Sequence, residues 1–245
     1  MKAIWNETFT PRHSEVDRNG RLKLKSLFDY FQEAAANHAS ELGCGMDYLR
    51  ECGKMWVLSR LKVEVLRTPT LGEPLMVKTY PSGRNRLFST REFDLRDAGG
   101  TTIVRGTSFW LLLATESLRP LRPADHLPDM VDNSTEPRFF PDLDKLPDAP
   151  GLAGIYTATV RDSQIDLNDH LNNAEYAAMV HNAAAEMFGG APEFSAVQIN
   201  YLSAANCGEE IAVRGLRTGR NFFIDGVDKN GVVKFQAEGA VKTDL

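Results

Sequence analysis

The chain is organised around the segment Ile165-Asp166-Leu167-Asn168-Asp169-His170-Leu171-Asn172-Asn173-Ala174-Glu175-Tyr176. Side chains alternate along an extended chain, so an extended backbone here would point Asp166, Asn168 and His170 to one face. Helix-forming residues follow over 174–188, and Asn172 or Asn173 can cap the helix that they predict. We therefore expect polar groups at the positive end of a helix, where a developing negative charge is stabilised. Asp and Asn are also common in turns, so a purely structural turn stays open as the alternative.

Composition excludes several classes of protein. The chain has 245 residues, of which 42% are hydrophobic, and carries a formal net charge of -5. An acidic chain is a poor candidate for general nucleic-acid binding. Cys44, Cys52 and Cys207 match neither a disulfide framework nor a zinc motif. No apolar signal core and no run of 18 apolar residues is present, so the sequence predicts a soluble, cytoplasmic protein.

Periodicity predicts an α+β fold. Residues 3–10 alternate as a strand does, and 16–20 have turn composition. Apolar residues recur at three and four positions over 24–41, which predicts a long amphipathic helix, and 46–52 favours a short second helix. Strand patterns follow at 56–66, 74–80, 87–96 and 101–115, with a hairpin turn at 97–100. We expect an antiparallel sheet wrapped around the long helix.

A proline-rich segment then interrupts the pattern. Seven prolines occur from Pro120 to Pro150, both included, which excludes a central strand or a long helix. We interpret 128–150 as a linker on the surface between an N-terminal domain, 1–127, and a C-terminal domain, 151–245.

The second half repeats the first. Shifted by 149 residues, Asp17, Asn19 and Leu22 fall on Asp166, Asn168 and Leu171. Shifted by 136 residues, the segment 83–85 (Gly-Arg-Asn) falls on 219–221 (Gly-Arg-Asn). This double match predicts a tandem duplication with an insertion in the first copy.

The repeat points to the second copy as the chemical one. Arg21 occupies in the first copy the position that His170 occupies in the second. Arginine cannot be deprotonated in proteins, whereas histidine titrates near neutrality and suits proton transfer.

The whole chain resembles the acyl-acyl-carrier-protein thioesterase family. The resemblance rests on the motif Asp-x-Asn-x-His-x-Asn-Asn-x-x-Tyr at 166–176, on the N-terminal helix region and on the strand start at 56–60. It implies a tandem double hot-dog fold, in which the first domain shapes an acyl-chain pocket and the second carries the catalytic motif. Because no transit peptide is visible, the chain is similar to bacterial members.

The resemblance also implies roles for individual residues. Asp166, Asn168 and His170 would be catalytic, Asn172 and Tyr176 would bind substrate, and no metal or organic cofactor is expected. The implied activity is hydrolysis of acyl-carrier-bound fatty acyl thioesters to free fatty acid. The implied partner is acyl carrier protein with its acyl-phosphopantetheine, and a homodimer is left open.

One departure from the family pattern stands out. The family has Glu three residues after Tyr in the strand that follows the second helix. Here the residue three positions after Tyr201 is Ala204. Ala205 occupies the position of a plant cysteine, and Cys207 lies beyond both. Two alternatives therefore remain: an acyl-CoA thioesterase, and an acyl-binding or carrier-binding module that does not hydrolyse.

Overall fold

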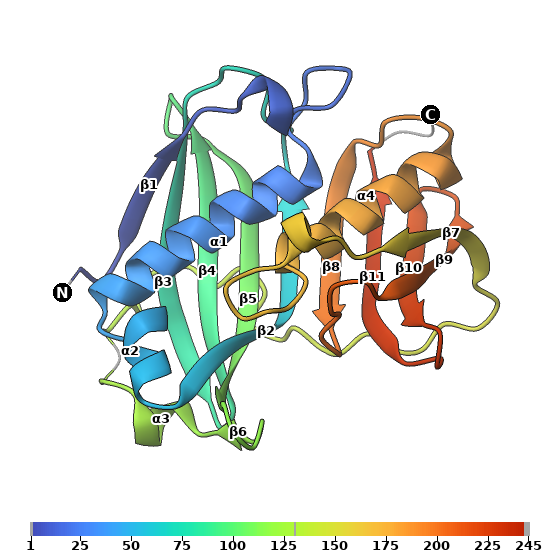
Figure 1. The fold of residues 1–245 in the computed structure, drawn as a ribbon. Coiled ribbons are helices and arrows are strands. Elements are labelled where there is room, and N and C mark those ends of the chain that lie inside the picture. Colours follow the sequence, from blue (N-terminus) through green and yellow to red (C-terminus); the bar gives the residue numbers. More distant parts are fainter. Residues whose placement is uncertain (1, 130, 243–245) are drawn as a thin grey trace. The chain divides into compact units, whose positions relative to one another are not determined.

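The computed structural model describes residues 2–129 and 131–242 and divides them into two compact units. Unit 1 holds the described residues of Met1–Thr10, Tyr30–Arg67 and Gly72–Leu143. Unit 2 holds Pro11–Asp29, Thr68–Leu71 and the described residues of Asp144–Leu245. Each unit is an antiparallel sheet with a long helix against one face (Figure 1).

The sheet of unit 1 has the strand order β1-β3-β4-β5-β2. Its strands are β1 (Trp5–Phe9), β2 (Lys54–Val65), β3 (Leu75–Asn85), β4 (Phe88–Asp97) and β5 (Thr102–Ala114), and the short β6 (Pro120–Leu121) pairs with β5. The predicted hairpin turn joins β4 to β5, where two backbone N–H groups donate to one carboxylate oxygen of Asp97.

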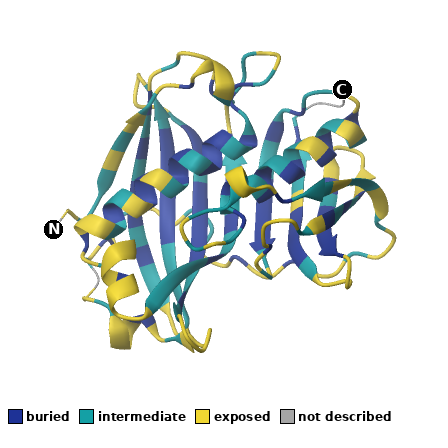
Figure 2. Ribbon diagram, in the orientation of Figure 1, coloured by how far each residue is buried: buried dark blue, intermediate teal, exposed yellow. Residues whose placement is uncertain are grey.

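Helix α1 (Leu24–Glu41) begins in unit 2 and continues in unit 1. Its apolar residues at three- and four-residue spacing are buried, as Figure 2 shows by the dark stripe along the helix. In unit 1, Phe31 stacks on Phe93 of β4 with ring centroids 4.5 Å apart. Ala34 is completely buried, and its small side chain lets the sheet approach the helix closely. The short helix α2 (Met46–Glu51) follows as expected.

Unit 2 repeats this plan. Its strands are β7 (Ala153–Thr159), β8 (Phe194–Tyr201), β9 (Glu210–Thr218), β10 (Asn221–Asp228) and β11 (Val233–Val241), in the order β7-β9-β10-β11-β8. Helix α4 (Asn173–Phe188) packs on this sheet, with Tyr176 edge-on to Phe235 and Phe188 edge-on to Phe222. The strand orders of the two units correspond position by position, so the predicted double hot-dog architecture is confirmed.

The proline-rich segment contains two short elements that its composition did not predict, β6 and helix α3 (Pro123–His126). Beyond them it lies on the face of the unit 1 sheet opposite α1. There Tyr80 Oη donates to the carbonyl of Pro137 at 2.7 Å, and Phe139 N–H donates to the buried carboxylate of Glu92 at 3.1 Å. In unit 2, Gln198 donates to the carbonyl of Asp144 at 2.8 Å. Its backbone polar groups are thus partly satisfied by the sheets.

None of the described helices has the length and apolar character that a membrane crossing needs. Within residues 2–129 and 131–242, no cluster of three or more His, Cys, Asp or Glu side chains forms a metal site.

Candidate active site

The motif folds as a tight turn, Ile165–Leu171, which we call the second turn. Ile165 and Leu171 form an antiparallel bridge, and Asp166 N–H donates to the carbonyl of His170 at 2.8 Å. Asp169 N–H donates back to the Asp166 carbonyl at 3.0 Å, and Asp169 has a φ of 62°. The backbone of 165–171 is therefore a turn and not the extended chain that would have pointed the three side chains to one face. The turn, and not strand alternation, holds the backbone of Asp166, Asn168 and His170 in one short loop.

Asp166 stabilises this turn. Its Oδ1 accepts the backbone N–H of Asn168 at 2.8 Å, which fixes the backbone between Asp166 and His170. Among the described residues, none hydrogen-bonds to the imidazole of His170, although that side chain is only half-exposed. Both ring nitrogens of His170 are therefore available to a substrate or a water molecule.

Helix α4 begins immediately after the second turn. Asn172 is its N-cap, with Oδ1 accepting the N–H of Ala174 at 2.8 Å. The helix ends at Gly189, whose φ of 74° is the left-handed conformation that glycine tolerates best. The positive end of the helix dipole thus lies next to His170, as the sequence predicted. The side-chain oxygen of Asn172 accepts the capping hydrogen bond, so its amide NH₂ is left to donate a hydrogen bond to a ligand.

Tyr176 lies deeper than the substrate-binding role suggested. Its side chain is 3% exposed and packs edge-on against Tyr201 and Phe235, each with ring centroids 5.5 Å apart. Its hydroxyl donates to the carbonyl of Ser203 at 3.5 Å. Burial raises the pKa of Tyr176, so the phenol stays neutral. In this structure Tyr176 supports the chain that follows β8.

That chain, Leu202–Asn206, is here called the backing segment. Its Ala205 carbonyl accepts the N–H of Leu171 at 2.8 Å, directly after His170. Ala205 is fully buried, whereas Ala204 is exposed beside it. Cys207 is an exposed free thiol beyond the segment. Strand β8 ends at Tyr201, so these residues belong to a loop and not to the strand.

The corresponding turn of the first copy, Val16–Leu22, is here called the first turn. It has the same bridge between its ends, and Asp17 Oδ1 accepts the N–H of Asn19 at 2.8 Å. Gly20, with a φ of 74°, stands where Asp169 stands in the second turn. The N–H of Leu22 donates to the Pro69 carbonyl at 2.8 Å, as that of Leu171 donates to Ala205. The two turns are thus equivalent, at the predicted shifts of 149 and 136 residues.

The two turns differ in the side chain at their sixth position, Arg21 in the first turn and His170 in the second. Arg21 of the first turn pairs with Asp17 and with Glu193, both at 3.2 Å, and donates to the Ala191 carbonyl at 2.9 Å. The guanidinium of Arg21 is therefore held by ion pairs and hydrogen bonds, whereas the imidazole of His170 at the equivalent position has no hydrogen bond to a described residue. The chemistry expected of the second turn is absent from the first because the residue type differs, not the backbone.

Sequence reasoning missed a buried ion cluster behind the backing segment. Lys234, only 6% exposed, pairs with Glu209 at 2.6 Å and with Asp228 at 3.4 Å. Its Nζ also donates to the carbonyl of Ala204 at 3.1 Å. The available signal was a lysine in the otherwise apolar sequence 232–235 (Val-Val-Lys-Phe), which exposure on a surface strand would also explain.

Two family models match the chain. The model described as acyl-ACP thioesterase N-terminal domain matches residues 2–131. The model described as acyl-ACP thioesterase C-terminal domain matches residues 153–234. The second match includes the second turn, the backing segment and Lys234.

Similar curated proteins are plant enzymes. Oleoyl-acyl carrier protein thioesterase 2 of Arabidopsis thaliana is 26% identical over 231 residues, which cover 87% of this chain and 62% of the relative. The dodecanoyl-[acyl-carrier-protein] hydrolase of Umbellularia californica is 28% identical over 234 residues, with 88% of this chain and 59% of the relative covered. The chain therefore spans about three fifths of the length of these relatives.

Solved structures share the fold. The acyl-ACP thioesterase from Bacteroides thetaiotaomicron superposes with a TM-score of 0.83 at 24% identity, covering 98% of each chain. The 12:0-ACP thioesterase from Umbellularia californica gives 0.78 at 22% identity, covering 98% of this chain and 97% of that one. At these identities the likeness establishes the fold and leaves the substrate to other arguments.

Proposed function

Because this chain belongs to the acyl-acyl-carrier-protein thioesterase family, we propose that it hydrolyses fatty acyl thioesters carried on acyl carrier protein. The products are a free fatty acid and the carrier thiol, and the reaction ends chain elongation. The observation that carries the proposal is the uncommitted imidazole of His170, held by a rigid turn at the positive end of helix α4.

Each of the five predicted site residues has a place in this reaction. His170 takes a proton from water as the water oxygen adds to the thioester carbonyl carbon. Asn168 and the N-terminal dipole of α4 stabilise the oxyanion. The C–S bond then breaks, and the thiolate takes the proton from His170. Asp166 fixes the turn through the Asn168 N–H, and Asn172 offers its amide NH₂ to the substrate. Tyr176 contributes by holding the backing segment.

We extend the proposal to a division of labour between domains. The N-terminal domain, 1–127, shapes the pocket for the acyl chain, since its helix and sheet present large aromatic side chains such as Phe31 and Phe93 to its core. The linker, 128–150, covers the sheets, and the C-terminal domain, 151–245, supplies the second turn.

A second candidate function is supported by one observation. Ala204 has no side-chain carboxylate where the family has Glu, so a module that binds acyl carriers without hydrolysis is the competing proposal. The decisive experiment measures free-thiol release from acyl-carrier and acyl-CoA substrates of several chain lengths. Thiol release from acyl-carrier substrates supports the proposed acyl-carrier-protein thioesterase. Preferential thiol release from acyl-CoA would show that the protein is an acyl-CoA thioesterase instead. Binding without any release over long incubation supports the binding module.

Restoring the family glutamate is expected to keep or raise activity. Ala204 is exposed, so Ala204→Glu can be accommodated without overpacking the core. A carboxylate near His170 would add a second proton acceptor, and a positioned base contributes about 10²–10⁴-fold where it is needed. The wild-type histidine already supplies most of this, so we expect a gain of at most about 10-fold in kcat. Ala204→Gln is the matched control, because it has the same size without the charge. An equal gain in both variants would mean that the charge is irrelevant.

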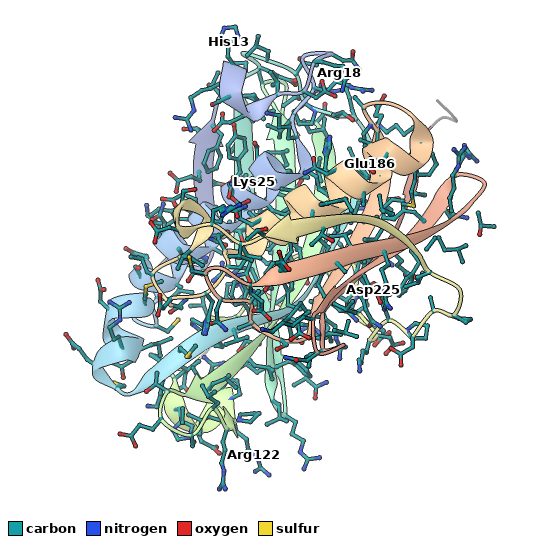
Figure 3. All side chains as sticks on the ribbon, turned by 45° about the vertical axis from the view of Figure 1, so that its right-hand side comes forward. His13, Arg18, Lys25, Arg122, Glu186 and Asp225 are labelled. Atoms are coloured by element: carbon teal, nitrogen blue, oxygen red, sulfur yellow. The ribbon has the colours of Figure 1, made fainter. Side chains whose placement is uncertain are left out.

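Carrier docking should depend on a local basic patch, since acyl carrier proteins are acidic and this chain carries a net charge of -5. Seven basic residues lie in or beside the first turn or in the β9–β10 hairpin: Arg18, Arg21, Lys23, Lys25, Arg214, Arg217 and Arg220. Arg21, Lys25 and Arg214 are paired with acids within unit 2. The other candidates are Arg18 and Lys23 at the first turn and Arg217 and Arg220 at the β9–β10 hairpin. Of these, Lys23, Arg217 and Arg220 donate to backbone carbonyls. Arg18 is labelled on its loop in Figure 3.

Charge reversal of the docking pair is expected to raise KM for carrier-bound substrate by about 10-fold at low salt, because each exposed contact contributes up to about 1 kcal/mol. KM for acyl-CoA should change by less than about 2-fold, and the difference should shrink as salt screens the charges. Arg18→Glu with Lys23→Glu and Arg217→Glu with Arg220→Glu serve as controls for each other. Equal effects on both substrates exclude docking by the pair tested.

A further inference from the structure

Both copies of the repeat contain a small ion cluster at the same place in their sheets. In unit 1, Arg67 joins Glu73 to Asp97, and in unit 2, Lys234 joins Glu209 to Asp228. The paired acids are equivalent. Glu73 and Glu209 are related by the 136-residue shift, and Asp97 and Asp228 each accept two backbone N–H groups in a β-turn.

The cations are not equivalent. In unit 1 the N–H groups of Leu66 and Arg67 both donate to the carbonyl of Ile103, at 2.9 and 3.1 Å. In unit 2 the N–H groups of Leu202 and Ser203 donate to the carbonyl of Lys234 at the same distances, 2.9 and 3.1 Å. Lys234 therefore replaces an isoleucine, and Ser203 replaces the arginine. The cation of unit 1, Arg67, lies in the segment after β2, whereas the cation of unit 2, Lys234, lies in strand β11.

This exchange changes the surroundings of the cation. The Arg67 side chain is 46% exposed, whereas that of Lys234 is 7% exposed. A buried ammonium needs partners for its three N–H groups. Lys234 has three acceptors: the carboxylates of Glu209 and Asp228, and the carbonyl of Ala204. The third acceptor connects the cluster to the backing segment.

The exchange also changes the segment itself. With the cation on the strand, residues 203–205 are Ser, Ala and Ala, where the first copy has Arg67, Thr68 and Pro69. These side chains are small, and among them Ala205 is fully buried. Polar contacts that hold the loop include Lys234 Nζ to the Ala204 carbonyl at 3.1 Å and Leu171 N–H to the Ala205 carbonyl at 2.8 Å, beside the Tyr176 hydroxyl on the Ser203 carbonyl at 3.5 Å.

We propose that Lys234 is a positioning residue for catalysis. It fixes the backing segment and, through it, the position of His170 in the second turn. The path runs from Lys234 Nζ to Ala204, along the backbone to the Ala205 carbonyl, and across to Leu171, the residue after His170. This role rests on the proposed thioesterase function. A displacement of about 1 Å at a reacting group costs on the order of 10²-fold in rate, so a backbone support of this kind has a large kinetic effect.

The test replaces Lys234 with Met and compares it with Arg67→Met, which removes the cation of the corresponding ion cluster in unit 1. For Lys234→Met we expect kcat to fall by about 10- to 100-fold with KM changed by less than about 3-fold. Arg67→Met should leave kcat within about 2-fold of wild type. Lys234→Arg, which keeps the charge, should recover part of the loss. If Lys234→Met fails to fold because two acids are left unpaired, the combined variant Lys234→Met, Glu209→Gln, Asp228→Asn gives the same comparison.

Amide hydrogen exchange provides a readout independent of activity. In Lys234→Met or the combined variant, peptides covering 165–176 should exchange faster because the Leu171 N–H loses its fixed acceptor, whereas Arg67→Met should leave them unchanged. Unaltered kcat and unaltered exchange in this region would overturn the positioning role. Absence of thiol release by the wild-type protein would instead overturn the proposed function, and the exchange data would still decide whether Lys234 supports the second turn.

Discussion

Replacing His170 with alanine is expected to lower the rate of thiol release by about 10²–10⁴-fold, the contribution of a positioned general base. The imidazole is half-exposed, and none of the described residues hydrogen-bonds to it, so its removal should cost little stability. Thermal unfolding of the variant should therefore coincide with wild type within about 0.5 kcal/mol. The measurement is thiol release under single-turnover conditions with carrier-bound substrate.

Arg21→Ala is the matched control, because Arg21 has the same position in the first turn. It should leave kcat nearly unchanged and lower the free energy of unfolding by about 1 kcal/mol, since it removes partly exposed ion pairs with Asp17 and Glu193. Cys207→Ala should have little effect on either quantity, because the exposed thiol lies outside the second turn. Thiol release that survives His170→Ala would place the chemistry elsewhere in the molecule.

The second large effect concerns stability in acid. His38 of α1 is fully buried in unit 1, with Nε2 2.9 Å from the Lys2 carbonyl and Nδ1 3.0 Å from a guanidinium nitrogen of Arg91. The carbonyl requires a proton on Nε2 and the guanidinium requires a lone pair on Nδ1, so the ring is neutral. Burial, reinforced by the charge of Arg91, lowers the pKa of His38 to about 4.

A histidine with a lowered pKa in the folded state takes up its proton more readily when the chain unfolds. The unfolded state therefore binds more protons between pH 6.5, the ordinary value, and about 4, and stability falls as pH falls through this window. On acidification from pH 7, we expect protonation linked to His38 to lower the free energy of unfolding by about 2 kcal/mol at pH 5 and by about 3 kcal/mol at pH 4.

The measurement is urea unfolding followed by tryptophan fluorescence at several pH values. Trp5, Trp56 and Trp110 all belong to unit 1, so the signal reports the unit that holds His38. His38→Gln, which keeps a donor for the Lys2 carbonyl but does not titrate, should lose less stability on acidification than wild type. Parallel losses in the two proteins would show that other groups cause the acid sensitivity.

Local features of the site could be predicted from residue type and spacing. A run of helix formers after Asn172 was enough to predict α4 and its cap, because capping involves residues two positions apart. The repeated Asp-x-Asn pattern was enough to predict that the two turns correspond, since each carboxylate bonds the backbone two residues ahead. The apolar spacing of 24–41 likewise predicted α1 with its observed ends.

The long-range partners could not be predicted in this way. The spacing of Tyr176 in the motif did not reveal that its ring is buried against Tyr201 and Phe235, because those contacts depend on how helix and sheet pack. Residue type showed that Arg21 cannot act as a base, but not that its guanidinium pairs with Glu193, which lies far away along the chain.

The sequence by itself determined the types of the long helices and strands and the turn that carries His170, because these depend on hydrogen bonds and periodicities within a few residues, and its internal repeat determined the duplication. The tertiary structure decided which charges are free and which are committed. Lys234 is indistinguishable in sequence from a surface lysine. Only the folded sheet buries it and brings Glu209, Asp228 and the Ala204 carbonyl to its three N–H groups. A buried charge is stable only with such partners, and pairing between distant segments depends on the whole chain.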